Sequence, residues 1–518
     1  MRKIKIFWVI LPIFLIGGSI STAATTRSVS QWGITWSFDK DYECGQFANG
    51  DYWVKTDSST GRVVITRIEP DLMLFDGKPV HGFEINPSPY KQGLDGRLTV
   101  FDPNLIPSLP YKAKPGDSIL KGVSHIPCPN SNCYPGIKTA SVLTVVSAIP
   151  KDNGSTIFRP PYVGKNKPMR STAEIKWSRV PVFDPVDDAP SLTWVVEKLG
   201  HVQMDHIRGN NMQTRPNDNL SDYGADINQI HGDAVLRLML NDTQRAKTAA
   251  MIAVLQAGID HYHFILEGQT WPRGGGEQPG RIILPLFSSY ILDDPEMQSV
   301  VSAQSPDLQY PYEIKTLHEN ASGIVLWGHY EGYNDEETYW DKLEKGSAAS
   351  GASTLADPYR FIDGGYIPGD VYQLCCTSQG FKQTALIMNL MPGLRKIWKH
   401  EHLLSYADRW VTFGAWTQPD PCAPVIRGGV RGVDYGPDPN HPGMCILDPD
   451  LAYYNGPSDF ACEEGKECGR FPSRHGVNND GGYRYSKFAA AMWKAYWRSE
   501  SKVLAPAINA VTDLILDE

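Results

Sequence analysis

The chain has 518 residues, of which 41% are hydrophobic and 11% aromatic, and its formal net charge is −9 at pH 7. This length predicts two or three domains, and the apolar content is enough for a large core. The acidic balance gives no overall attraction to nucleic acid, and the sequence has neither a basic arm nor a zinc-finger spacing. Nucleic acid is therefore excluded as an expected partner, and an anionic substrate would need local arginines.

The first residues have the pattern of a secretory signal peptide. Arg2 and Lys3 precede an apolar run over residues 6–16, and small residues follow that run. The run is shorter than the roughly 20 apolar residues that a transmembrane anchor needs. We therefore expect residues 1–23 to be removed by cleavage after Ala23, which leaves a secreted or periplasmic chain without a transmembrane anchor.

Short β-like runs fill the chain from about residue 30 to residue 195. Pro, Gly, Asn and Asp separate these runs, as is typical of strands joined by turns. Clear runs lie at residues 52–54, 62–67, 98–100 and 140–146. We expect residues 24–195 to form an all-β, sandwich-like domain.

From residue 222 onward the apolar spacing becomes that of amphipathic helices. Thr243 is a plausible N-cap for one of them. The expected helices cover residues 222–240, 243–266, 281–292, 378–391, 401–416, 485–498 and 503–516. Helices separated by long loops favour a mainly helical (α/α) toroid over residues 196–518, so the predicted fold class is a multidomain α+β protein.

A Gly/Pro-rich loop, W-P-R-G-G-G-E-Q-P-G-R over residues 271–281, interrupts two of the helix-like segments. Pro and Gly break helices and let the backbone approach a ligand closely. Trp271 offers a stacking face, and Arg273, Glu277 and Arg281 offer charge. The loop is therefore the first candidate for a functional site, and an ordinary connection between helices is the alternative interpretation.

Nine cysteines would remain after signal cleavage, and in an oxidising compartment they are more typical of disulfides than of metal sites. Cys128 with Cys133, and Cys462 with Cys468, are plausible local pairs. The odd number requires one cysteine to stay unpaired or to bridge two chains. No C-x-x-C pair with matching histidines is present, so no zinc site is expected.

The sequence predicts no required cofactor. The acidic run at residues 434–450 contains oxygen ligands of the kind that Ca²⁺ prefers, but it does not match the EF-hand pattern. A Pro-rich loop closed by disulfides is the favoured interpretation of that run, so calcium stays possible but unsupported. The chain also lacks a Walker A motif, a dinucleotide-binding fingerprint and a G-x-S-x-G motif.

Several motifs are distributed along almost the whole mature chain. They are W-G-I-T-W-S-F-D (32–39), G-Q-F-A-N-G-D-Y-W-V (45–54), F-R-P-P-Y (158–162), D-Y-G-A-D-I (222–227), H-G-D-A (231–234), C-C-T-S (375–378), Y-A-D-R-W (406–410) and G-R-F-P-S-R-H-G (469–476). They resemble a largely uncharacterised family of secreted proteins from polysaccharide-degrading bacteria. More broadly, the chain resembles heparinase-like and alginate-lyase-like proteins, in which an (α/α) toroid is joined to a β domain. The resemblance implies an extracellular, anionic polysaccharide as substrate.

The residue types favour a lyase that cleaves a uronate-containing polysaccharide by β-elimination. Such an enzyme stabilises an enolate, removes the C5 proton and protonates the departing oxygen, for which Arg, Asn, His and Tyr are suited. The catalytic candidates are His206 or His475 as the base and Tyr223 or Tyr485 as the acid. The candidates for holding the substrate are Asn219, Arg273, Arg281 and Asn478, with Trp271 as a stacking face.

Structural roles compete with each of these assignments. His231, His261 and His263 lie inside expected helices, where packing or a buried hydrogen bond is the favoured interpretation. His206 and His475 lie in Gly/Asn-rich stretches, and for them both interpretations stay open.

Two other functions stay open. A glycoside hydrolase needs two carboxyl groups, which Glu277 together with Asp205, Asp226 or Asp480 could supply. A non-catalytic glycan-binding surface protein could use some of the 14 tryptophans for stacking, although aromatic burial is the default interpretation. Unsaturated products would indicate a lyase, new reducing ends without them a hydrolase, and retention without turnover a binding protein.

Overall fold

The computed structural model describes residues 23–128, 133–208, 214–221, 224–271, 280–305, 378–413 and 486–498, together with residue 433 and four short strands at residues 317–319, 325–327, 435–437 and 445–447. Residues 1–22 of the expected signal peptide and the expected helix at residues 503–516 lie outside the described residues.

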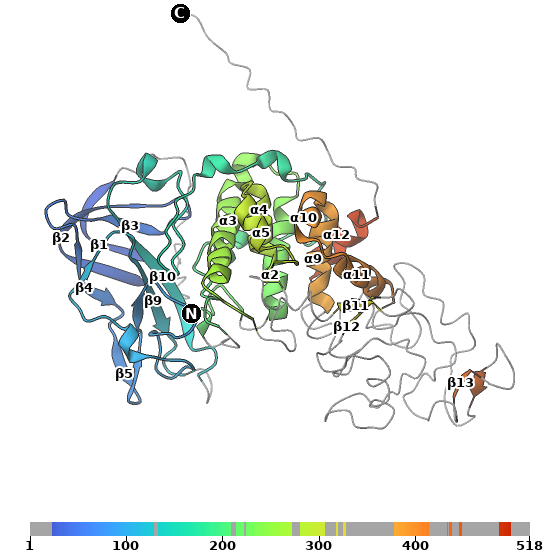
Figure 1. Cartoon of the computed structure of the whole chain (residues 1–518), viewed down its shortest axis with the longest axis horizontal. Coiled ribbons are helices and arrows are strands. Elements are labelled where there is room, and N and C mark those ends of the chain that lie inside the picture. The colour runs from blue at the N-terminus through green and yellow to red at the C-terminus, as the bar shows by residue number, and fades with distance from the viewer. Residues whose placement is uncertain are drawn as a thin grey trace, which may run out of the picture.

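The N-terminal part of the protein is one mixed, curled sheet of eight strands (Figure 1). Its strands are β1 (Ala24–Gln31), β2 (Ile34–Gln46), β3 (Tyr52–Lys55), β4 (Val63–Glu69), β7 (Phe83–Ile85), β8 (Tyr111–Ala113), β9 (Ser118–Ser124) and β10 (Ile137–Val146). Along the sheet the order is β7–β9–β10–β3–β2–β4–β8, and β1 pairs with β2. β10 and β3 run parallel, whereas the other pairs run antiparallel.

The burial of the strands explains how the sheet meets the helices. In β2, Ile34, Trp36 and Phe38 are buried on one face while Thr35 and Ser37 between them are half-buried, the alternation of a strand with one covered face. In β10 nearly every residue is buried. Leu143 packs with β2 on one face, and Val142 packs on the other face with Phe264 of α3 (Gln244–Leu266). The sheet is therefore covered by a helix at β10.

The described residues also form smaller elements outside the main sheet and the helices. Three two-stranded sheets pair β5 (Met73–Phe75) with β6 (Lys78–Val80), β11 (Leu317–Glu319) with β12 (Val325–Trp327), and β13 (Tyr435–Pro437) with β14 (Cys445–Leu447). Single 3₁₀ turns occur at Pro103–Leu105, Lys151–Gly154, Thr172–Glu174 and Trp177–Arg179.

A helical region follows the sheet. Besides α3 it contains α1 (Leu192–Leu199), α2 (Gly224–Leu238), α4 (Ile283–Ile291), α5 (Pro295–Val300), α9 (Ser378–Leu390), α10 (Pro392–Trp398), α11 (Glu401–Phe413) and α12 (Lys487–Tyr496). In Figure 1, α2 to α5 lie in the middle of the view and α9 to α12 lie beyond them, on the side away from the sheet. Residues from all these helices share one apolar core.

Local sequence signals account for several helix starts. The hydroxyl of Thr243 accepts a hydrogen bond from the Ala246 amide, which confirms the predicted cap of α3. Ser191 and Ser486 cap α1 and α12 in the same way. Such caps satisfy amide groups that the first helical turn leaves without partners.

Two glycines permit close helix packing. A Cβ at Gly258 of α3 would lie 2.0 Å from the Ser288 Oγ of α4, so a larger residue would push these two helices apart. Gly280 has a φ of +85°, and a Cβ there would lie 2.3 Å from the Cα of Asn228 in α2. The chain that enters α4 is therefore held directly against α2.

The structure confirms the expected α+β class and refines both halves. Where the sequence predicts a sandwich-like domain, eight strands form one curled sheet, and within the described part of residues 24–195 only β5 and β6 pair apart from it. No second sheet of described strands covers β10, because α3 packs against that face. The β-like run at residues 98–100 is a turn, since Val100 has a left-handed φ of +52° that a strand cannot contain. Among the described helices no toroid is evident.

Helix α3 is long and apolar enough, by length and composition, to pass as a membrane span. Of its most apolar window, 89% is buried inside the protein. Burial of this kind is typical of a core helix, and no other helix in the described residues meets the same criteria.

The predicted pairing of Cys128 with Cys133 is confirmed, with a Cα–Cα distance of 4.8 Å. Cys44, in β2, is a buried free thiol, and burial raises its pKa to about 12. The other predicted pair, Cys462 with Cys468, lies outside the described residues.

Candidate functional site

A buried carboxylate, Asp205, is the centre of the candidate site. One oxygen, Oδ1, accepts a hydrogen bond from Arg215 Nε at 2.7 Å. The other, Oδ2, accepts from Arg281 Nε at 2.9 Å and from the Trp271 indole Nε1 at 3.2 Å. Burial opposes ionisation of Asp205, but the charges of Arg215 and Arg281 outweigh it and hold its pKa well below the ordinary value. Asp205 is therefore an anion across the whole physiological range.

This carboxylate fixes both ends of the Gly/Pro-rich loop. Trp271 and Arg281 are the first and last residues of the loop, and residues 272–279 between them lie outside the described residues. The backbone around Asp205 is fixed as well, because the Gln269 side-chain amide donates to the carbonyl oxygens of Asp205 and Ile207 at 2.8 and 2.9 Å. The loop therefore starts and ends on one rigid support.

Two histidines from neighbouring helices lie beside this support. His231 of α2 donates its Nδ1 proton to the Gly280 carbonyl at 3.1 Å, and His261 of α3 donates its Nδ1 proton to the Ala257 carbonyl at 2.8 Å. Their ring centroids lie 5.5 Å apart. Burial lowers the pKa of His231 to about 3 and also lowers that of His261. Both imidazoles are therefore neutral at pH 7.

The tautomer of each ring follows from these bonds. Because a carbonyl oxygen only accepts, the proton of each neutral ring lies on Nδ1 and the lone pair lies on Nε2. Within the described residues neither Nε2 atom has a hydrogen-bond partner. The Nε2 atom of His261 lies 4.0 Å from Asp205 Oδ2. The cluster thus contains two buried proton acceptors.

The same cluster does not fit a metal ion. The described residues contain no group of three His, Cys, Asp or Glu side chains arranged to hold one. The carboxylate of Asp205, which lies near His261, already contacts two guanidinium groups, which would repel a cation.

His206 lies in an adjoining cluster. Its ring is fully buried, its Nδ1 lies 2.9 Å from the Tyr162 hydroxyl oxygen, and its Nε2 lies 3.7 Å from Glu84 Oε1. Burial raises the pKa of Tyr162 well above its ordinary value, so the phenol keeps its proton. The ring of Phe264 contacts both His206 and His261, with centroids 5.9 and 5.1 Å away, and lies between the two clusters.

A third buried cluster joins the sheet to α3. Arg159 donates from Nε to Asp51 Oδ2 at 2.6 Å and from Nη2 to Asp260 Oδ2. Asp51 and Arg159 belong to two of the motifs that carry the family resemblance, and Asp260 precedes His261 on α3. These two motifs therefore meet in space. The ion pairs of Arg159 fix the position of α3 relative to the sheet.

The structure brings only part of the predicted site together. Trp271 and Arg281 share Asp205, whereas Asn219 donates to the carbonyl of Lys198 at 3.3 Å, at the end of α1. The Trp271 side chain is 4% exposed, so its indole is engaged by Asp205 rather than presented to a ligand. The remaining candidates, which stay predictions, lie outside the described residues: Tyr223, Arg273, Glu277, His475, Asn478 and Tyr485.

Comparisons with family models, with curated proteins and with solved structures found no match for this chain. The function therefore has to follow from the chemistry of the site.

Sequence reasoning missed part of the cluster. It considered Asp205 only as a partner for Glu277, and it did not single out Arg215. It interpreted His231 and His261 as packing residues, and the buried hydrogen bonds that it expected for them are present. Helical periodicity shows which residues of α2 and α3 face the core. It does not show that His231 and His261 come together beside the end of the Gly/Pro-rich loop.

Proposed function

We propose that the protein is a secreted enzyme that cleaves a uronate-containing polysaccharide by β-elimination. The single observation that carries the proposal is the attachment of both ends of the loop at residues 272–279 to Asp205. The loop contains an arginine and a carboxylate among glycines. A loop whose two ends are fixed on a helical scaffold is a common way to present catalytic side chains.

Chain connectivity supports a shared site for Arg273 and Tyr223. Arg273 follows Trp271 by two residues in the sequence, and we therefore assign it to the fixed end of the loop. In the sequence Tyr223 directly precedes α2, and Asn228 of α2 packs against Gly280. The start of α2 and the end of the loop are therefore neighbours.

In the proposed reaction the base takes the C5 proton of the uronate, and the electrons form a C4–C5 double bond as the C4–O bond breaks. Arg273 holds the carboxylate on which negative charge develops, and Tyr223 donates a proton to the departing oxygen. The proposed base is His475, because the ring of the other candidate, His206, is fully buried. Asp205 acts as a positioning residue, because it fixes the loop without reaching the substrate.

The test is turnover by the purified mature chain on alginate, glucuronan, ulvan, pectin and glycosaminoglycans. We expect an ultraviolet-absorbing unsaturated product from one of these polymers. Arg273→Ala and His475→Ala should each lower turnover roughly 100-fold or more, by loss of charge stabilisation and of the base. Arg245→Ala, at an exposed arginine of α3, is the matched control. Full activity in the Arg273 and His475 variants would refute the assignment.

Glycoside hydrolysis is the second candidate, because Glu277 lies in the same loop. Of its possible partner carboxylates, Asp205 is buried and both of its oxygens accept hydrogen bonds from arginine or tryptophan, so it is unsuited to act as a base or nucleophile on a sugar. That leaves Asp226 and Asp480 as partners for Glu277. New reducing ends without an unsaturated product, lost in Glu277→Gln, would favour this function. Retention on a polysaccharide matrix without turnover would favour a glycan-binding protein.

The (α/α) toroid expected from the sequence belongs to the same proposal. Its support is that α2, α4, α9 and α11 contribute to one continuous apolar core. A lyase groove of this type would lie where the loops between successive helices meet.

A further inference from the structure

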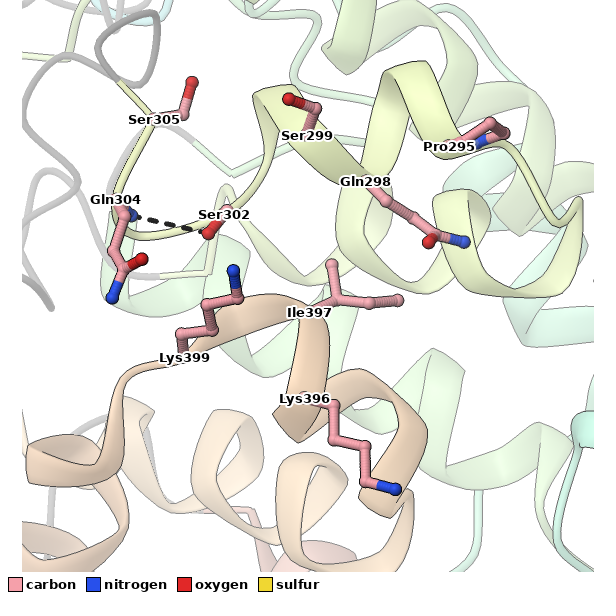
Figure 2. Close-up of a pocket in the computed structure, with 9 residues that line it drawn as sticks. All are labelled: Pro295, Gln298, Ser299, Ser302, Gln304, Ser305, Lys396, Ile397 and Lys399. Atoms are coloured by element: carbon pink, nitrogen blue, oxygen red, sulfur yellow. Dashed lines mark hydrogen bonds between the residues drawn. The ribbon is translucent and has the colours of Figure 1, made fainter.

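A cavity lies between α5 and the end of α10 (Figure 2). Its volume is about 650 Å³, within the range of pockets that hold small ligands. One wall is α5 with the chain that follows it, including Ser299, Ser302 and Gln304, and the other wall includes Lys396 and Lys399.

The two walls are held together by backbone and apolar contacts. The amide of Ala303 donates to the carbonyl of Trp398 at 3.0 Å, which joins the chain after α5 to the end of α10. The Trp398 side chain is fully buried. A Cβ at Gly393 would lie 2.3 Å from the Tyr290 ring, so glycine lets α10 approach α4. The cavity is therefore a fixed feature of the fold.

The lining of this cavity is polar and cationic. Hydroxyls, side-chain amides and two ammonium groups line it, and among the described residues no carboxylate does. This is the reverse of the whole chain, which carries a net charge of −9. Hydroxyls and amides recognise sugar hydroxyls, and ammonium groups recognise carboxylate or sulfate.

The charges at the end of α10 are not all neutralised. Arg395 is paired with the carboxylate of Glu401. Within the described residues no ion pair involves Lys396 or Lys399. Cations in a last helical turn also complement the helix dipole, and Lys396 fits that simpler role.

Lys399 does not fit the simpler role alone. It caps α10 in the left-handed conformation, with a φ of 56°, a position that glycine or asparagine usually fills. Figure 2 shows its side chain extending across the cavity toward Ser302, whereas the Lys396 side chain extends in a different direction. Of the two lysines, Lys399 is therefore the one whose ammonium group is directed toward the wall that contains Ser302.

We propose that this cavity binds a carboxylated or sulfated sugar unit, with Lys399 as the residue that recognises the anion. It would act as an accessory subsite for an acidic polysaccharide, so the choice of a sugar rests on the proposed function. Ser302 and Gln304 contact the sugar hydroxyls beside the anionic group.

The test is calorimetric titration of the full mature chain with an oligogalacturonate trisaccharide, a sulfated disaccharide, a neutral trisaccharide and inorganic sulfate. We expect an acidic sugar to bind more tightly than the neutral one, and Lys399→Gln to weaken that binding about tenfold, because one charged hydrogen bond is lost. Lys494→Gln, which removes the same charge from the exposed last turn of α12, should leave binding unchanged.

Several results would overturn the proposal. They are equal binding by the wild type and Lys399→Gln, equal loss in Lys494→Gln, or binding of inorganic sulfate as tightly as the sugars. Thermal unfolding of both variants shows that they stay folded. Turnover is measured separately: an active enzyme without Lys399-dependent binding would refute only this subsite, and Lys399-dependent binding without turnover would refute only the proposed reaction.

Discussion

Two buried charge clusters beside the same stretch of α3 have opposite compositions. At Arg159 one guanidinium lies between two carboxylates, and at Asp205 one carboxylate lies between two guanidiniums. Burial raises the pKa of Asp260 to about 6 against the attraction of Arg159. At Asp205 burial acts in the same direction, but two cations reverse the shift. A buried carboxylate with two cationic neighbours therefore stays ionised near neutral pH. A buried carboxylate that shares one cation with a second carboxylate takes up a proton near pH 6.

Removing the carboxylate of Asp205 should lower the free energy of unfolding more than any other change considered below. In Asp205→Asn one side of the amide presents N–H groups to an arginine that also donates, so a buried guanidinium loses its acceptor. Breaking a buried ion pair on one side costs about 3–5 kcal/mol. We expect the free energy of unfolding in urea to fall by that amount, with little change in the loss between pH 5 and pH 8.

The matched control is Asp293→Asn. Asp293 is paired with Arg179 but its side chain is 50% exposed, so the same chemical change should cost less than about 1 kcal/mol. A loss at Asp205 no larger than the loss at Asp293 would contradict the role of Asp205 as the support of the loop.

Removing the central cation should have a slightly smaller, pH-dependent effect. Arg159→Met leaves Asp51 and Asp260 buried without a counter-ion, and we expect a loss of about 3 kcal/mol at pH 7.5. At pH 5 protonation of Asp260 relieves part of the repulsion, so the loss should shrink by about 1–2 kcal/mol. Urea unfolding at the two pH values measures the difference, and a pH-independent loss would contradict the comparison.

The two clusters also show what the sequence could and could not predict. The 3.6-residue spacing, with Thr243 as a cap, correctly placed α3, and the short polar loop correctly paired Cys128 with Cys133. Neither signal reveals partners far apart in sequence. Arg159 meets Asp260 across 101 residues, and Arg281 meets Asp205 across 76.

For the candidate site, too, the sequence predicted local features but not contacts between distant residues. The breaks in periodicity identified the loop between Trp271 and Arg281, because Gly and Pro act locally. The role of Trp271 was not predictable, since an indole that stacks on sugar and an indole that donates to a buried carboxylate have the same sequence. That distinction depends on burial, which is a property of the folded chain.

A smaller effect should appear when Asp260 alone is made neutral. Because its pKa is raised in the folded state, Asp260 stabilises the protein below its unfolded pKa, and this contribution is lost as pH rises through about 6. Asp260→Asn should remove that dependence, which is at most about 1.4 kcal/mol per pH unit between pH 4 and 6. Asp205→Asn should not alter the slope there, because a depressed pKa acts only at lower pH.

The smallest effect is expected at an exposed ion pair, where the same charges lie in water. Arg395 and Glu401 form a close pair, yet their side chains are 44% and 58% exposed. Arg395→Gln should lower the free energy of unfolding by less than about 0.5 kcal/mol, because solvent screens the pair and holding two long side chains costs entropy. Added salt should weaken the pair further. A loss comparable to that of Arg159→Met would mean that contact geometry, rather than burial and surplus charge, sets the strength of these clusters.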